Sequence, residues 1–206
     1  MNTTEVIYSG EIKDFKTLYS LAKKQFLEYE KIEGISNWEE YDFSLDCPED
    51  QMKLKDMLQI RCIEEITEAS VAIDEGEEHF LEEIGDVINF FLSAYIMMGY
   101  DLNKLPSPGG LLCVSSGFKN VPTLNSYSIW GYKVIESIGK LCNLLKNRPW
   151  SESNYMVSIV DYNKRAMNLW FDFWTFISFL GLTSKDLFEI FWKKYIVNIH
   201  RRETHY

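Results

Sequence analysis

Residues 64–91 read EEITEASVAIDEGEEHFLEEIGDVINFF, and this stretch decides the fold. Between Glu64 and Asp86 it holds ten carboxylates and neither lysine nor arginine. Apolar residues recur at helical spacing beside the acids, on both sides of Gly76. They are Ile66, Ala69, Ile73, Phe80, Ile84, Val87, Ile88 and Phe91. Because glycine readily ends a helix in a left-handed conformation, the pattern predicts two antiparallel helices joined by a tight turn.

Four of the ten carboxylates form two pairs, in each of which the second member follows three positions after the first. The pairs are Glu65 with Glu68 and Glu83 with Asp86. Residues three apart lie on one face of a helix. Glu68 and Glu83 would share a level roughly 10 to 12 Å from the turn, and Glu65 and Asp86 the next level at roughly 15 to 17 Å. All four should therefore converge if both faces point inward.

A cluster of like charges on partly buried faces either takes up protons or holds cations. Oxygen ligands without cysteine or histidine favour Mg²⁺ or Mn²⁺. A di-iron site is disfavoured, because it uses Glu-x-x-His pairs and the nearby histidine, His79, falls in the predicted turn. The spacing of four leaves Glu64 with Glu68 and Glu82 with Asp86 as alternative pairs. Otherwise Glu64 and Glu82 are interpreted, with Glu75, Glu77 and Glu78, as a solvated face.

Length and charge limit the classes of protein to consider. The 206 residues suit one domain over residues 1–206. The net charge of −10 equals the contribution of the acidic stretch, so the charge asymmetry is local and does not indicate nucleic-acid binding. The four cysteines have no paired spacing, which favours reduced thiols and a cytoplasmic location. The most apolar stretches run about fourteen residues, short of the roughly twenty that span a bilayer.

Helical patterns cover most of the chain, so we expect an all-α bundle of about six helices. The predicted helices are 12–31, 48–74, 77–98, 126–146, 152–180 and one that begins at a capping box, Thr183 to Asp186, and continues toward the C-terminus. Residues 5–8 and 111–115 are candidate short extended pieces. The aromatic residues crowded into 170–179 predict a heavy core or a subunit interface.

Cations follow one stripe of the last predicted helix. Lys194, Asn198 and Arg201 stand at i, i+4 and i+7, and Tyr206 ends the chain. Such a stripe can hold the oxygens of a polyphosphate whose other oxygens lie on metal ions. The alternative is a solvated basic end that offsets the helix dipole.

These motifs resemble those of a known family. EEITE and EEIGDVINFF are similar to the E-x-x-E and E-x-x-D signature of the all-α nucleoside triphosphate pyrophosphatase superfamily, which includes MazG-like proteins and dimeric dUTPases. Dimeric dUTPases from phages and other sources close with a pattern that Lys194, Asn198, Arg201 and Tyr206 match in part. The segment NWEE, residues 37–40, is similar to one near their base pocket.

The resemblance implies a homodimer that hydrolyses dUTP to dUMP and pyrophosphate. It implies that two or more Mg²⁺ ions are bound by Glu65, Glu68, Glu83 and Asp86, and that Glu65 also helps to activate water. It further implies phosphate binding by Lys194, Asn198, Arg201 and Tyr206, and base binding by Gln25, Glu28, Asn37 and Trp38.

Departures from the family pattern concern the base more than the reaction. Relatives carry Q-x-x-N on the first helix, whereas this chain has Gln25 and Glu28, and Asn89 stands where several relatives have histidine. A glutamate accepts hydrogen bonds where asparagine also donates them, so an exocyclic amino group, as on cytosine, becomes an alternative ligand. Pyrophosphohydrolysis of dCTP or another, modified dNTP, and a non-catalytic interaction protein on the same scaffold, therefore stay open.

Overall fold

The computed structural model describes residues 15–32, 43–108, 121–146 and 156–204, and every regular element in these ranges is a helix. The prediction of an all-α fold is therefore confirmed. The elements are α2 (Phe15–Ile32), α3 (Pro48–Lys55), η1 (Asp56–Cys62), α4 (Ile63–Ala72), α5 (Glu77–Met97), α7 (Leu124–Cys142), α8 (Ile159–Phe179) and α9 (Ser184–Glu203). None of the helices in the described ranges is long and apolar enough to cross a bilayer.

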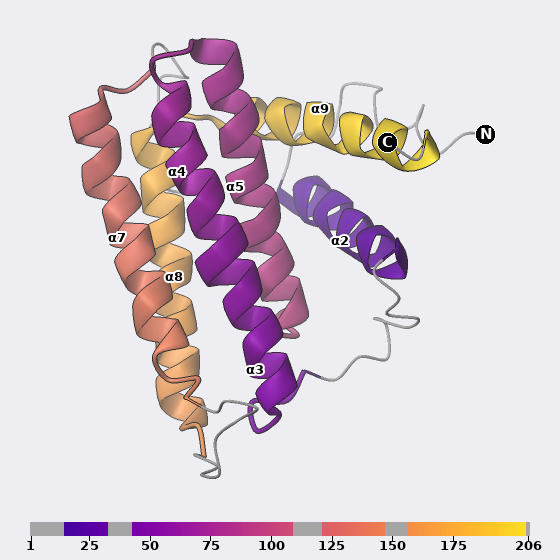
Figure 1. The fold of residues 1–206 in the computed structure, drawn as a ribbon, viewed down its shortest axis with the longest axis vertical. Helices are drawn as coiled ribbons and strands as arrows, with labels where there is room; N and C mark the ends of the chain where they lie inside the picture. The colour runs from indigo at the N-terminus through magenta and orange to yellow at the C-terminus, as the bar shows by residue number, and fades with distance from the viewer. Residues whose placement is uncertain (1–14, 33–42, 109–120, 147–155, 205–206) are drawn as a thin grey trace.

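Three of these elements form one continuous rod, in which α3, η1 and α4 follow one another without a break (Figure 1). The backbone stays right-handed helical at both junctions, at Lys55 and at Cys62. The middle segment, η1, is a π-helix of seven residues. The sequence pattern predicted a regular helix over 48–74 and did not foresee this π segment.

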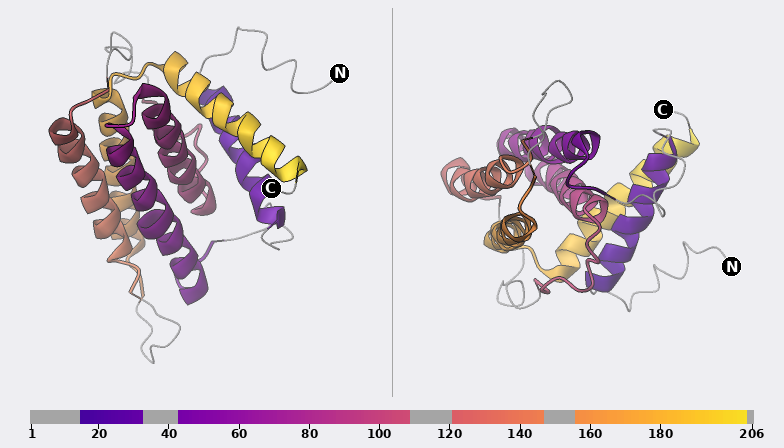
Figure 2. Two further views of the ribbon diagram at one scale, coloured as in Figure 1. Left: turned by 45° about the horizontal axis from the view of Figure 1, so that its top comes forward. Right: turned by 90° about the horizontal axis from the view of Figure 1, so that it is seen from below.

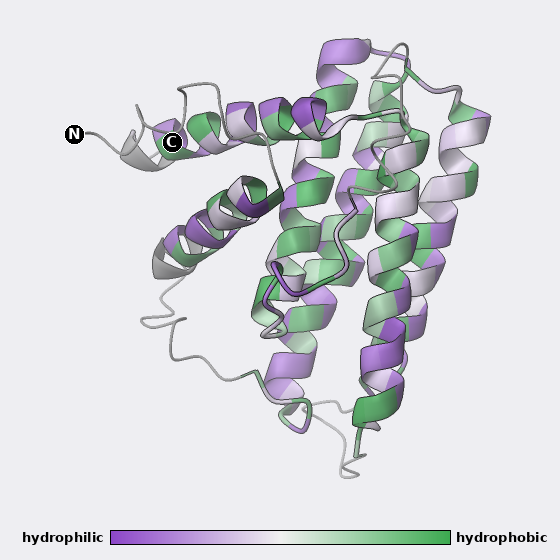
Figure 3. Cartoon of the chain, turned by 180° about the vertical axis from the view of Figure 1, so that it is seen from behind, coloured by the Kyte–Doolittle hydropathy of each residue, from purple (hydrophilic) through white to green (hydrophobic). Residues whose placement is uncertain are grey.

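Four long rods stand side by side, with α4 next to α5 and α7 next to α8 (Figure 1). Helices α2 and α9 lie outside this four-helix bundle and pack against one side of α5 and against each other (Figures 1 and 2). The helices carry both apolar and hydrophilic stretches (Figure 3), as amphipathic helices do. The bundle thus has one flank to which a second, smaller layer is attached.

The aromatic cluster of α8 fills the bundle core. Its buried members are Trp170, Phe173, Trp174 and Phe176, whereas Phe171 and Phe179 remain exposed. Phe91 of α5 stacks on Phe173, and Trp170 meets Trp174 edge to face. Each such ring buries about 150 to 250 Å², which contributes roughly 4 to 6 kcal/mol of hydrophobic free energy. The prediction that these residues form a heavy core is confirmed for the four buried rings.

The turn between α4 and α5 is made by Gly76, as predicted, but in another conformation. Gly76 has φ +125° and ψ 168°, outside the left-handed helical region that the sequence pattern suggested, and it serves as the N-cap of α5. Its amide donates to the carbonyl of Ala72 at 3.2 Å, and its carbonyl accepts from the amide of Phe80 at 3.0 Å. Only glycine adopts this backbone region readily, so the residue fixes the hairpin.

Caps correct the boundaries of the later helices. Thr123 caps α7, which ends at Cys142 rather than at residue 146. Ser158 caps α8 and accepts from the amide of Asp161 at 3.3 Å, so this helix begins at Ile159 rather than at residue 152. The capping box at the start of α9 is confirmed. The predicted extended pieces at 5–8 and 111–115 lie outside the described residues.

Candidate functional site

Three of the predicted metal ligands meet on the α4–α5 hairpin. Glu65 of α4 and Glu83 and Asp86 of α5 each offer one carboxylate oxygen, and these oxygens lie within 4.8 Å of one another. All three residues are half-buried. Within the described ranges this is the one group of three or more acidic, histidine or cysteine side chains so close together. The antiparallel hairpin therefore produces the convergence that its symmetry about Gly76 predicted.

The fourth predicted ligand, Glu68, is exposed and is not a member of this group of oxygens. It still lies near enough to Glu65 for its charge to help raise the pKa of that residue. Glu64 and Glu82, from the alternative pairs with a spacing of four, are exposed as well. The geometry thus favours the pairs with a spacing of three, with Glu68 at the edge of the cluster.

The positive charges near the cluster do not balance its negative charge. Burial, followed by the charges of Asp86, Glu68 and Glu83, raises the pKa of Glu65 to about 8. Burial also raises the pKa of Asp86, although Lys194 and Arg201 act in the opposite direction. With no cation bound, Glu65 therefore carries a proton at neutral pH. A divalent cation bound to the cluster would favour the ionised form of Glu65, so the proton would be released.

The basic stripe of α9 faces this cluster. Lys194 forms an ion pair with Asp86, and the side chains of both residues are mostly buried, with exposed fractions of 20% and 15%. Gly85 permits the close approach of the two helices, because a Cβ atom at this position would lie 3.0 Å from Cγ2 of Ile190 and 3.9 Å from Cβ of Lys194. The absence of a side chain at Gly85 thus lets the cation of α9 reach the carboxylates of α5.

A cavity of about 240 Å³ opens beside Glu65 and Asp86. Its cationic wall includes Arg61, Lys194 and Arg201; its other lining side chains include Phe26, Met57, Asn89, Phe90, Ser93 and Asn198. The two asparagines are at most 7% exposed, and Oδ1 of Asn89 has no hydrogen-bond partner. The cavity therefore joins acidic oxygens, cations, buried amides and aromatic surface in one place, which suits a ligand that is part anion and part ring.

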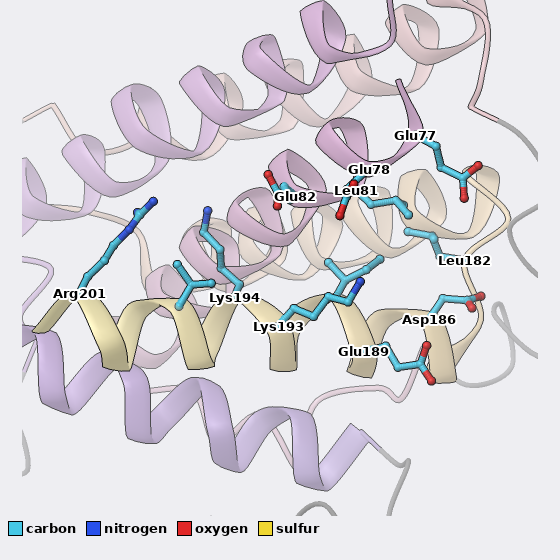
Figure 4. A pocket seen from close by; sticks show the side chains of 12 residues that line it. Glu77, Glu78, Leu81, Glu82, Leu182, Asp186, Glu189, Lys193, Lys194 and Arg201 are labelled. Carbon is cyan, nitrogen blue, oxygen red and sulfur yellow. The ribbon is translucent and has the colours of Figure 1, made fainter. Parts of the chain in front are cut away.

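A second, larger hollow of about 490 Å³ lies in the groove between α5 and α9 (Figure 4). Lys194 and Arg201 border both hollows, and Figure 4 shows these side chains rising from α9 toward α5. The larger groove is lined by Glu77, Glu78 and Glu82 but by none of the three clustered carboxylates. The smaller cavity is therefore the better candidate for a site of chemistry, although it is the less spacious of the two.

Of the predicted base-binding residues, the two that the structure describes, Gln25 and Glu28, do not line this cavity. Gln25 is 1% exposed, neither end of its amide has a hydrogen-bond partner, and Glu28 forms an ion pair with Lys24 at 4.0 Å. Neither Gln25 nor Glu28 is among the residues that line the cavity, whereas their neighbour Phe26 is. Asn37, Trp38 and Tyr206 lie outside the described residues, so their predicted roles stay predictions.

The sequence reasoning missed several residues at the site. His79 lies in the first turn of α5 and not in the preceding turn, and its Nε2 contacts Oε1 of Glu83 at 2.9 Å. The spacing of four between these two residues was a signal for that contact. Arg61 likewise precedes Glu65 by four residues, which places it on the same helical face. In the sequence, Asn89 stands out only because several relatives have histidine there, and nothing indicates that it lines the cavity.

Comparisons with known proteins leave the family open. No protein-family model matches the chain, and no curated protein or solved structure is significantly similar to it. The chemistry of the cavity and of its carboxylates must therefore indicate the function.

Proposed function

We propose that the protein is a Mg²⁺-dependent nucleoside triphosphate pyrophosphohydrolase, which releases a nucleoside monophosphate and pyrophosphate. One observation carries the proposal: Glu65, Glu83 and Asp86 hold carboxylate oxygens within 4.8 Å of one another, and two of them, Glu65 and Asp86, line a cavity together with Lys194 and Arg201. Carboxylate oxygens suit a metal ion, and the cations beside them suit an anion. The combination fits an anionic substrate that is bound through a metal. The resemblance of the acidic and basic motifs to the pyrophosphatase superfamily points to the same reaction.

The residues present fit such a metal. Glu65, Glu83 and Asp86 would hold Mg²⁺, with Mn²⁺ as the alternative and Glu68 at the edge for a further ion. When bound, the metal neutralises phosphate charge and lowers the pKa of water. The pKa of about 8 at Glu65 supports this assignment, because the cluster is poorly compensated without a cation. Glu65 is also the group that we propose to accept a proton from the attacking water.

Helix α9 supplies the groups for the phosphates. Lys194, Asn198 and Arg201 line the cavity from one side, and we propose that they hold phosphate oxygens. Lys194 is paired with Asp86 here, so cation binding at Asp86 would leave the ammonium group to the substrate. Positioning and electrostatic stabilisation supply most of the catalysis of phosphoryl transfer, which is the work that these fixed side chains suit.

The first nucleotide to test is dUTP, on the strength of the resemblance. The alternatives are dCTP and other or modified dNTPs. The assay incubates the protein with each dNTP and Mg²⁺ and separates the products. Formation of monophosphate and pyrophosphate from one nucleotide supports the proposal, whereas turnover of none by a folded protein would exclude it. In that case a nonhydrolysable nucleotide with Mg²⁺ that leaves the melting temperature unchanged would favour a non-catalytic interaction protein.

Glu83→Gln and Glu82→Gln form a matched pair that tests the carboxylate cluster. They remove the same charge from adjacent positions of α5, of which only Glu83 belongs to the cluster. We expect Glu83→Gln to lower kcat by more than about a hundredfold, because a metal ligand is lost, and Glu82→Gln to leave it nearly unchanged. Circular dichroism should show equal helicity. Full activity in Glu83→Gln would contradict the assignment.

A further inference from the structure

A third cation borders the cavity, and it comes from an element other than α9. Arg61 lines it together with Glu65, and the Arg61 side chain is 41% exposed, so it reaches both solvent and cavity. Arg61 belongs to η1, in the same rod as Glu65, whereas Lys194 and Arg201 belong to α9. The cavity therefore has cations from two elements, η1 and α9.

The π segment holds Arg61 in this position. Nε of Arg61 donates to Oδ2 of Asp56 at 3.3 Å, across five residues. Side chains five residues apart in an α-helix diverge by about 140°. In a π-helix, whose hydrogen bonds link residues five apart, they come to the same side. The contact between Asp56 and Arg61 is thus a product of the π geometry.

A second element also contacts the guanidinium group. It lies 5.9 Å from the centre of the Phe90 ring of α5, within the range of a cation–π interaction. A guanidinium has five N–H donors in a planar fork, so one side chain can hold Asp56 and a phosphate at the same time. Asp56 and Phe90 thus both help to orient Arg61, and its guanidinium group is of a kind that binds anions.

We infer that Arg61 binds the phosphate chain of the substrate together with Lys194 and Arg201. The inference rests on the proposed function, since it takes the ligand to be a polyphosphate. The phosphates would then meet cations from both η1 and α9, with the carboxylate cluster beside them. The role of η1 is then to present a cation that a regular helix would not hold against Asp56.

The test measures binding of inorganic pyrophosphate in the presence of Mg²⁺ to the full chain, by isothermal titration calorimetry. Arg61→Ala should weaken binding by roughly tenfold or more, because a charge-assisted hydrogen bond is lost. For the accepted nucleotide it should raise KM more than it lowers kcat. The pyrophosphate affinity of Arg61→Lys should fall between those of the wild type and of Arg61→Ala, since an ammonium group cannot form the bidentate contact.

Arg165→Ala is the matched control, because Arg165 is an exposed arginine of α8 that lines a different hollow. It should bind pyrophosphate as the wild type does. Equal weakening in both variants would mean that the lost net charge explains the effect, and it would overturn the inference. Unchanged affinity in Arg61→Ala would overturn it as well. Should that variant unfold, Arg61→Gln replaces it, and wild-type affinity in Arg61→Gln overturns the inference as well.

The two proposals can fail separately. If the wild type hydrolyses no nucleotide, the proposed function fails, while pyrophosphate binding that depends on Arg61 would still support the role of this residue. If nucleotides are hydrolysed and Arg61→Ala leaves both KM and pyrophosphate affinity unchanged, the role of Arg61 fails and the proposed function stands. If the wild type does not bind pyrophosphate with Mg²⁺ at all, the role of Arg61 fails whatever the assay of hydrolysis shows.

Discussion

At the scale of single residues, the site is a balance between burial and charge. Glu65 sits among three other acids, and its pKa of about 8 reflects that crowding and its partial burial. Asp86 differs because Lys194 lies against it and opposes the effect of burial on its pKa. If the cluster binds a cation as proposed, the two carboxylates would respond differently: Glu65 would lose a proton, and Asp86 would exchange a lysine for the metal.

The raised pKa of Glu65 predicts how stability depends on pH without metal. The unfolded chain releases this proton near the ordinary glutamate pKa of 4.5, whereas the folded protein keeps it up to about pH 8. The free energy of unfolding should therefore fall as pH rises through this window, by at most about 1.4 kcal/mol per pH unit from this group. Urea unfolding in EDTA at pH 5, 7 and 8.5 measures the slope.

Glu65→Gln is the control for this slope, since an amide does not titrate and keeps the shape of the side chain. Its unfolding free energy should depend less on pH over the same window. Mg²⁺ should stabilise the wild type more at pH 8.5 than at pH 5, because protons compete for the ligands at the lower pH. A wild-type slope equal to that of Glu65→Gln would show that Glu65 titrates normally.

At the scale of elements, close approaches and turns decide whether the carboxylates and cations meet. Gly76 sets the level of α5 relative to α4, and Gly85 sets how near α9 comes to α5. The π segment adds a third adjustment, because it lets Asp56 meet Arg61. The assembly of the site therefore depends on three local features: the turn at Gly76, the missing side chain at Gly85 and the π segment.

Gly76→Ala and Gly139→Ala should change stability in opposite directions. Gly76 needs φ +125°, a strained conformation for alanine, so the substitution should lower the unfolding free energy by roughly 1 to 3 kcal/mol. Gly139 lies inside α7 with open space around the position of a Cβ atom, so alanine should raise it by about 0.5 to 1 kcal/mol. Urea unfolding measures both, and a shared sign would contradict the account of the hairpin.

Gly85→Ala should affect the site more than the fold. The new Cβ atom would press on Cγ2 of Ile190, and α9 would move away from α5. Since small misplacements of catalytic groups are costly, we expect about a tenfold loss of kcat/KM with little change in helicity. Adding Ile190→Ala removes the contacted methyl group and should recover part of the loss. No recovery in the double variant would argue against a steric cause.

At the scale of the whole molecule, a four-helix bundle carries a flank of two helices, and the site lies where they join. The proposed homodimer belongs to this scale, and it rests on the resemblance to dimeric dUTPases. Light scattering coupled to size exclusion should give twice the 24.2 kDa of one chain. A mass of one chain across a hundredfold range of concentration would exclude a stable homodimer.

Much of this architecture was predictable, because helical periodicity and caps are local signals. The hairpin symmetry located Glu65, Glu83 and Asp86, and the capping box located the start of α9. The spacing of four from Glu65 was a signal for Arg61, but its contact with Asp56 depends on a π segment that leaves no mark in the hydrophobic pattern. The start of α8 was predicted too early for another reason. Several serines precede this helix, and the sequence alone does not show that Ser158 is the cap.

The attachment of α9 has a consequence for how cooperatively the protein opens. This helix contacts mainly α5 and α2, while the bundle core is built from the other helices with α5 (Figure 2). Local opening free energies within one protein range from near zero up to that of global unfolding. Swinging α9 outward would separate Lys194 and Arg201 from the carboxylates, at the cost of exposing the buried side chains of α9 itself, among them Leu187, Phe191 and Tyr195. Capture and release of an anion would then require the rearrangement of one helix and not the melting of the domain.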